Sequence, residues 1–175
     1  MRWIFPCFVP VAVLFISPAL AQQSAPYSAS SKESQEQPEE AAVRKLSELT
    51  FHQGHDLTCL AGARETGDSK QGPAVSLVKF EPGCIIPWHW HTPNENVMVL
   101  DGTLQQEWKS RETQVAKHGD FIHIPSHQIN RVKCISDSPC MIYLYTDAVF
   151  DMHYVDPAGR EISAKEAIAA DASRP

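Results

Sequence analysis

Short apolar runs alternate with turn-forming residues along most of the chain after residue 56. The apolar runs cover 57–61, 75–80, 84–91, 96–100, 103–108, 121–124, 129–135 and 141–146. Gly, Pro, Asp and Ser gather between them, at 66–68, 81–83, 101–102, 118–120 and 136–139. Short strands at this spacing are typical of an all-β sandwich or barrel. Asp101-Gly102 gives the strongest hairpin signal, because this dipeptide suits a two-residue turn between paired strands.

Both ends of the chain depart from this pattern. Residues 22–40 consist mainly of Ser, Gln, Glu and Pro, a composition that cannot bury enough apolar surface to fold. A short helix is expected at 41–49. Near the other end, Ser163 and Glu166 have the spacing of a capping box and predict a short terminal helix. We therefore predict a disordered linker at 22–45, one β domain at 46–160, and a short helix with a tail at 161–175.

Residues 1–21 have the features of a secretory signal peptide. Arg2 precedes an apolar run at 3–16, and Ala19-Leu20-Ala21 offers small residues for cleavage. The run is too short and too rich in proline to span a membrane, so we expect no membrane anchor after cleavage and a secreted or periplasmic protein. The net charge of −6, or −7 once Arg2 is removed, argues against nucleic acid as a partner.

Four cysteines remain after the predicted cleavage, and an oxidising compartment would favour their pairing. Cys134 and Cys140 flank a turn-rich stretch between two predicted strands, so we expect them to form a disulfide across a hairpin. For Cys59 and Cys84 two alternatives remain open, a second disulfide or two buried free thiols.

The segment from Gly83 to Gly102 holds the strongest chemical motif. It reads G-x5-H-x-H-x3-E-x6-G, with His89, His91 and Glu95 at its defined positions. Residues two apart on a strand point to the same face, so both imidazoles can approach one point. A turn at 92–94 lets Glu95 return to that side. Two nitrogens and one carboxylate suit a divalent transition metal, and the alternative is a polar cluster without metal.

This segment resembles the first motif of the cupin family at every defined position. The resemblance implies a conical double-stranded β-helix, or jelly-roll barrel, that holds a metal inside. The family's second motif, G-x5-P-x-G-x2-H-x3-N, begins correctly at Gly119 and Pro125. It then departs, because His127 replaces the glycine, Asn130 the histidine ligand and Cys134 the asparagine.

The departure leaves three alternatives for a fourth metal ligand. The amide oxygen of Asn130 could bind the metal, His127 could reach it after a local backbone shift, or water could fill the position. We favour Asn130 beside the metal and His127 at the mouth of the barrel. The predicted metal residues are thus His89, His91, Glu95 and Asn130, for iron, manganese, zinc, copper or nickel (Fe, Mn, Zn, Cu or Ni).

Two functional hypotheses follow. The first is an exported metal-binding cupin that acts on a small organic molecule, as an oxygenase-like or isomerase-like enzyme; two histidines and one carboxylate suit iron(II) and dioxygen chemistry. The second is a non-catalytic barrel that binds a small molecule with weak metal binding or none. We assign no catalytic acid, base or nucleophile.

Several further side chains are candidates for lining or flanking the site. Gln106 or Glu107 could point into the barrel, although a solvated face is expected for Glu107. His123 has two interpretations, as a pocket residue or as an ordinary strand histidine. Trp88 and Trp90 should cover the outside of the motif strand, against the chain itself or against a second copy in a homodimer.

Overall fold

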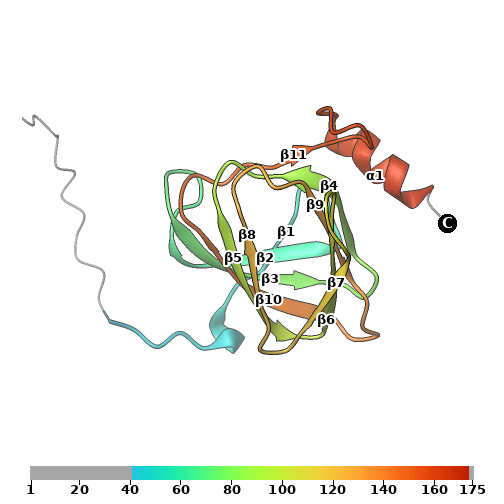
Figure 1. Cartoon of the computed structure of the whole chain (residues 1–175). Coiled ribbons are helices and arrows are strands. Elements are labelled where there is room, and N and C mark those ends of the chain that lie inside the picture. Colours follow the sequence, from blue (N-terminus) through green and yellow to red (C-terminus); the bar gives the residue numbers. More distant parts are fainter. Residues whose placement is uncertain (1–40, 174–175) are drawn as a thin grey trace, which may run out of the picture. The chain divides into compact units, whose positions relative to one another are not determined.

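The computed structural model describes residues 41–173, which form two antiparallel β-sheets and one short α-helix (Figure 1). The predicted signal peptide and most of the predicted linker lie outside these residues. The all-β prediction with a C-terminal helix is confirmed. Among the described residues, no helix is long and apolar enough to cross a membrane.

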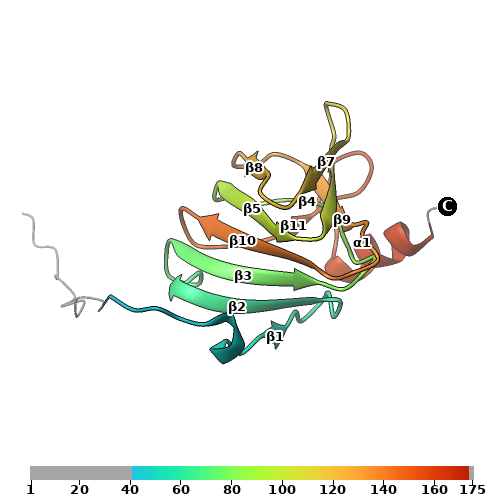
Figure 2. The same cartoon turned by 90° about the horizontal axis from the view of Figure 1, so that it is seen from below.

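The first sheet has the strand order β1-β2-β3-β10-β5-β8. Its strands are β1 (His52–Gln53), β2 (Leu60–Gly67), β3 (Ala74–Phe80), β10 (Cys140–Thr146), β5 (Glu95–Asp101) and β8 (Phe121–Ile124). Figure 2 shows β2, β3 and β10 side by side in this sheet. A 3-10 turn, η1 (Leu46–Glu48), precedes β1. The short helix expected at 41–49 is thus reduced to these three residues.

The second sheet has the order β11-β4-β9-β6-β7. Its strands are β11 (His153–Tyr154), β4 (Ile85–Trp90), β9 (Asn130–Cys134), β6 (Thr103–Trp108) and β7 (Gln114–Lys117). The sequence pattern does not predict β7, because this edge strand is only four residues long and three of them are exposed.

Asp101-Gly102 forms a corner between the two sheets, and the predicted hairpin was wrong. β5 ends at Asp101 in the first sheet, and β6 begins at Thr103 in the second. Gly102 has a positive φ of 76°, and a Cβ atom there would lie 2.8 Å from the Cα of Cys140. Glycine is required at this corner both for its backbone conformation and for its lack of a side chain.

Two disulfides lie at the end of the barrel near this corner. Cys134–Cys140 joins β9 to β10, so the predicted pairing is confirmed but it links the two sheets and not the arms of a hairpin. Cys59–Cys84 also forms, which decides between the alternatives left open for these cysteines. The backbone N–H of Cys134 donates to the carbonyl of Cys84 at 2.9 Å, so the two bridges are neighbours. We call this the disulfide end.

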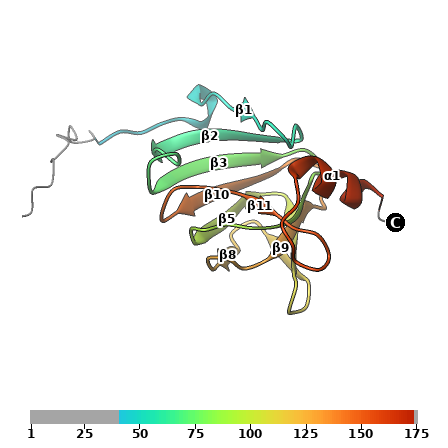
Figure 3. The same cartoon turned by 90° about the horizontal axis from the view of Figure 1, so that it is seen from above.

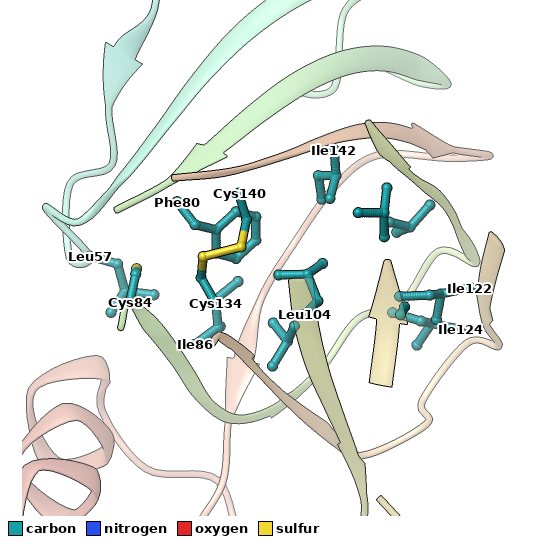
Figure 4. Close-up of a cluster of buried hydrophobic side chains, with 14 of the residues drawn as sticks. Leu57, Phe80, Cys84, Ile86, Leu104, Ile122, Ile124, Cys134, Cys140 and Ile142 are labelled. Carbon is teal, nitrogen blue, oxygen red and sulfur yellow. A yellow bond between two sulfur atoms is a disulfide. The ribbon is translucent and has the colours of Figure 1, made fainter. Parts of the chain in front are cut away.

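The hydrophobic core fills the space between the sheets. Phe80, Leu104 and Val99 are almost fully buried, and Figure 4 shows Phe80 and Leu104 close to the Cys134–Cys140 bridge. Ile122 and Ile124 of β8 contribute to the same cluster. Their burial removes large apolar surfaces from water, the main favourable term in folding.

The helix α1 (Ala164–Ala172) lies on the β4–β11 side of the second sheet (Figures 1 and 3). Its capping box is formed as predicted, because Ser163 Oγ accepts from the N–H of Glu166 and the Glu166 carboxylate accepts from the N–H of Ser163. Near its other end, Asp171 accepts two hydrogen bonds from Arg131 at 2.7 and 2.9 Å. Arg131 also pairs with Glu107, so α1 is attached to β9 and β6 through one buried and two partly buried charges.

Candidate functional site

A cavity of about 190 Å³ lies between the two sheets and holds five polar side chains in an otherwise apolar lining. These are His89, His91, Glu95, Gln106 and Asn130. Each is between 1% and 5% exposed. The structure thus brings the four metal residues predicted from the sequence into one buried space, together with Gln106.

An irregularity in β4 aims the first histidine into this cavity. The pairing of β4 with β9 shifts register between Ile86 and His89, and Pro87, which has no backbone N–H to donate, lies within the shift. Ile86 and His89 both line the cavity, although an odd spacing would place them on opposite faces of a regular strand. His91 follows directly after β4, and Glu95 opens β5 beyond the turn.

Backbone carbonyls hold both imidazoles. His89 Nδ1 donates to the carbonyl of Pro87 at 2.7 Å, and His91 Nδ1 donates to the carbonyl of Asp151. A carbonyl can only accept, so in the neutral form of either ring the hydrogen sits on Nδ1 and Nε2 retains a lone pair. The Nε2 of His91 lies 3.4 Å from Glu95 Oε2, and the two histidine rings are 4.8 Å apart between centroids.

Burial favours the uncharged forms of two of these groups. The pKa of His89 falls from 6.5 to about 3, because burial penalises the cation and His91 adds repulsion. Burial also raises the pKa of Glu95, an effect that the nearby His91 partly offsets. A neutral imidazole is the form that binds a metal, whereas the carboxyl group must lose its proton to do so.

Asn130 and His127 occupy different environments. The amide oxygen of Asn130 accepts from Gln106 Nε2 at 2.8 Å, while its nitrogen donates to the carbonyls of Gln128 and His89 at 3.2 and 3.4 Å. The ring of His127 instead stacks on Trp90, with centroids 4.5 Å apart. Because Trp90 projects from β4 on the side away from the cavity, His127 lies apart from the other candidate ligands.

Among residues 41–173, no three His, Cys, Asp or Glu side chains are arranged to hold one metal ion. The donor types nevertheless suit a transition metal, since two imidazoles with free Nε2 atoms and one carboxyl group line the same cavity. Metal-bound histidines usually donate their second ring N–H to a carbonyl or carboxylate, and the carbonyls of Pro87 and Asp151 accept such hydrogen bonds here. The residues present therefore fit a metal in chemistry, and their side chains would need to draw closer to bind it.

Residues 147–152, which we call the strap, cover the polar end of the cavity. Phe150 and Met152 contribute to its lining, and the Phe150 ring lies 4.8 Å from that of His91. Asp147 accepts from the N–H and side-chain amide of Asn94 at 2.9 and 2.6 Å. Asp151 accepts from the N–H of Thr92 at 2.7 Å. The strap could not be predicted from the sequence, because each of its contacts joins residues more than fifty positions apart.

The remaining candidates divide between the cavity and the surface. Gln106 points inward, whereas Glu107 points outward to Arg131. His123 is exposed and shares a 2.9 Å hydrogen bond with Asn96 Oδ1. His153 stacks on Trp90 with centroids 3.9 Å apart, so Trp90 lies between two histidine rings on the outer side of β4.

Comparison with known proteins supports a shared fold. Residues 76–146 match the model of a protein family described as Cupin domain, and no protein of curated function matches the sequence. The polyketide cyclase RemF from Streptomyces resistomycificus superposes with a TM-score of 0.59 at 13% identity, over 67% of this chain and 87% of that one.

Two further solved structures give a similar result. A sugar phosphate isomerase from Silicibacter pomeroyi has a TM-score of 0.56 at 18% identity, over 66% of this chain and 82% of that one. A cupin-2 domain protein from Rhodospirillum rubrum has a TM-score of 0.54 at 14% identity, over 70% and 84%. At these identities the likeness shows the fold alone, and it confirms the jelly-roll barrel predicted from the sequence.

Proposed function

This chain belongs to the cupin family, and we propose that its barrel binds a small organic molecule beside a divalent transition metal held by His89, His91 and Glu95. One observation carries the proposal: backbone carbonyls fix the Nδ1–H of both histidines, which leaves each Nε2 available in the same buried cavity as Glu95. Such an ion, when bound, supplies Lewis acidity or a centre for oxygen chemistry.

The chain's own residues would prepare this site in three ways. The carbonyls of Pro87 and Asp151 orient the two imidazoles. Phe150 and Met152 on the strap keep water from the polar end. Asn130, held by Gln106, leaves the fourth ligand position to a water molecule or to the bound organic molecule. An open position is what separates catalytic metal sites from structural ones.

Similar folds include enzymes, which supports a catalytic role. The cyclase and the isomerase compared above both act on small molecules according to their descriptions. The opposing hypothesis is a non-catalytic binding barrel, for which the predominantly apolar lining of the cavity would suffice without a metal.

Metal content distinguishes these functions. Protein purified without chelators should contain about one transition-metal ion per chain by plasma mass spectrometry, and His89→Ala should lose it. The matched control is His123→Ala, since His123 is an exposed strand histidine outside the cavity. A folded wild-type protein without metal, even after incubation with iron, manganese, zinc, copper and nickel salts, would refute the metal proposal and favour the non-catalytic barrel.

We also propose that the protein is exported. The composition of residues 1–21 supports this, and so do the two disulfides, because such bonds persist in oxidising compartments. After expression of the full chain in a Gram-negative host, the mature protein should appear in the periplasm or the medium with Gln22 as its first residue. An uncleaved chain confined to the cytoplasm would contradict the proposal.

A further inference from the structure

The cavity has a polar end and an apolar end. Glu95 lies level with Ile124 where β5 begins, and the next inward residue of β5, Val97, is flanked by Leu144 and Ile122. All four of the hydrophobic residues named here line the cavity. The first sheet therefore offers one carboxyl group beside the strap and an apolar surface from there towards the disulfide end.

The second sheet shows the same change from polar to apolar side chains. His89 and Asn130 are paired across β4 and β9, and Gln106 is hydrogen-bonded to Asn130. Towards the disulfide end the lining changes to Ile86 and Leu104. The polar groups of both sheets thus form one layer beneath the strap, and the remainder of the cavity is hydrocarbon.

The lining also lacks the groups that bind charged or highly hydroxylated molecules. Of the described residues around the cavity, none is Lys or Arg, and none carries a hydroxyl group. A carboxylate or phosphate buried in the apolar part would have no cationic partner, and a sugar would leave hydroxyl groups without hydrogen bonds. Gln106 and Asn130 already bind each other, which further reduces the number of polar atoms available to a ligand.

The size of the cavity sets the scale of its occupant. Its volume of about 190 Å³ somewhat exceeds the roughly 150 Å³ of an apolar cavity that holds benzene in another protein. One substituted aromatic ring fits such a space. A ring with a single polar substituent could place that substituent in the polar layer and its hydrocarbon part against Val97 and Leu104.

We infer that the cavity selects neutral, mostly apolar molecules of the phenol class, with the hydroxyl group among His89, His91 and Glu95 and the ring towards the disulfide end. This inference deepens the proposed function, since it names the class of molecule bound in the same cavity. The exclusion of anions follows from the lining and the volume of the cavity, so it applies to the metal-free protein; a bound divalent metal would itself attract an anion.

Calorimetric titration of the full mature chain tests the inference with three probes: 4-methylphenol, 4-methylbenzoate and glucose. Each is measured on chelator-treated protein and on protein incubated with zinc, whose metal content is determined separately. In the chelator-treated protein, 4-methylphenol should bind at least about tenfold more tightly than the other two, because only it avoids burying an unpaired charge or several hydroxyl groups.

Two matched variants locate the binding. Val97→Phe fills the cavity from β5, whereas Val115→Phe makes the same change on β7, where Val115 is 52% exposed. Binding of 4-methylphenol should weaken at least about tenfold in the first variant and remain unchanged in the second. Leu144→Phe, at a partly buried position on β10, serves the same purpose if circular dichroism shows that Val97→Phe does not fold.

The possible outcomes test the ligand class and separate it from the proposed metal site. Tighter binding of 4-methylbenzoate or glucose to the chelator-treated protein overturns the inference, and so does failure of 4-methylphenol to bind in either metal state. Unchanged binding in a folded cavity-filling variant also overturns it. Binding of 4-methylphenol by a protein that takes up neither zinc nor iron, manganese, copper or nickel supports the ligand class while refuting the proposed metal ligands.

Discussion

Replacing His89 by Asn should make the metal-free protein less sensitive to acid. In the folded protein the pKa of His89 is about 3, compared with 6.5 for an ordinary histidine. Between these values the unfolded chain binds a proton at His89 and the folded protein does not. Folding stability must therefore rise with pH across this window and fall as pH drops from about 6.5 towards 3.

The magnitude follows from the difference in pKa. Each pKa unit corresponds to about 1.4 kcal/mol, so between pH 7 and pH 4 His89 should cost the folded state about 3 kcal/mol. Asn cannot titrate, and its side-chain amide can still donate to the carbonyl of Pro87, the bond that His89 Nδ1 makes. The variant should therefore lose less stability on acidification than the wild type by about this amount.

Urea denaturation of chelator-treated protein at pH steps from 7 to 4, followed by tryptophan fluorescence, measures this difference. Other groups also titrate, so the quantity of interest is the wild-type loss of unfolding free energy minus that of the variant. Val115→Asn is the control, because Val115 is an exposed residue of β7 without a titratable group and its replacement should leave the acid sensitivity unchanged. Parallel pH profiles for the wild type and His89→Asn would show that His89 is not held neutral by burial.

Three other changes should give distinct results. Glu95→Gln should raise the unfolding free energy of the metal-free protein at neutral pH, measured by urea denaturation. Burial raises the pKa of Glu95, so the wild type loses stability as the pH rises above the ordinary value of 4.5, and Gln cannot titrate. An equal or lower unfolding free energy in the variant would contradict this. Asp171→Asn should cost about 1–3 kcal/mol by weakening two hydrogen bonds from buried Arg131, and unchanged thermal unfolding would argue against attachment of α1 through this pair. Replacing both cysteines of Cys59–Cys84 by Ser should lower the unfolding free energy by about 3–4 kcal/mol, and the same change in Cys134–Cys140 by only about 2 kcal/mol. The larger loss is expected for the bridge that closes the longer loop, since the sequence separations are 25 and 6. The reverse order in denaturant titrations would show that loop entropy is not the main contribution.

The sequence predicts the site where its geometry is local. His89, His91 and Glu95 lie within seven residues, so strand alternation and one turn suffice to bring them together. The bulge that brings both Ile86 and His89 to the cavity could not be read from that alternation. It depends on how β4 pairs with β9, which is a long-range property.

The errors share a physical cause. A local turn signal such as Asp101-Gly102 fixes where the chain bends but not which strand the next segment pairs with, so it does not distinguish a hairpin from a corner between two sheets. The strap was missed for a related reason, since Asp151 acts on His91 through its backbone carbonyl, a group that every residue carries. The engagement of Asn130 by Gln106 likewise depends on cross-strand neighbours.

The two ends of the barrel differ in their covalent links, and this difference bears on where a small molecule can enter the cavity. Both disulfides lie at one end, whereas the strap is held at the other by hydrogen bonds from Thr92 and Asn94. Local openings begin where the fewest strong links must break, so a small molecule would enter and leave past the strap while both sheets stay paired. The first groups it would meet are the histidines, and its hydroxyl group would leave the cavity before its ring.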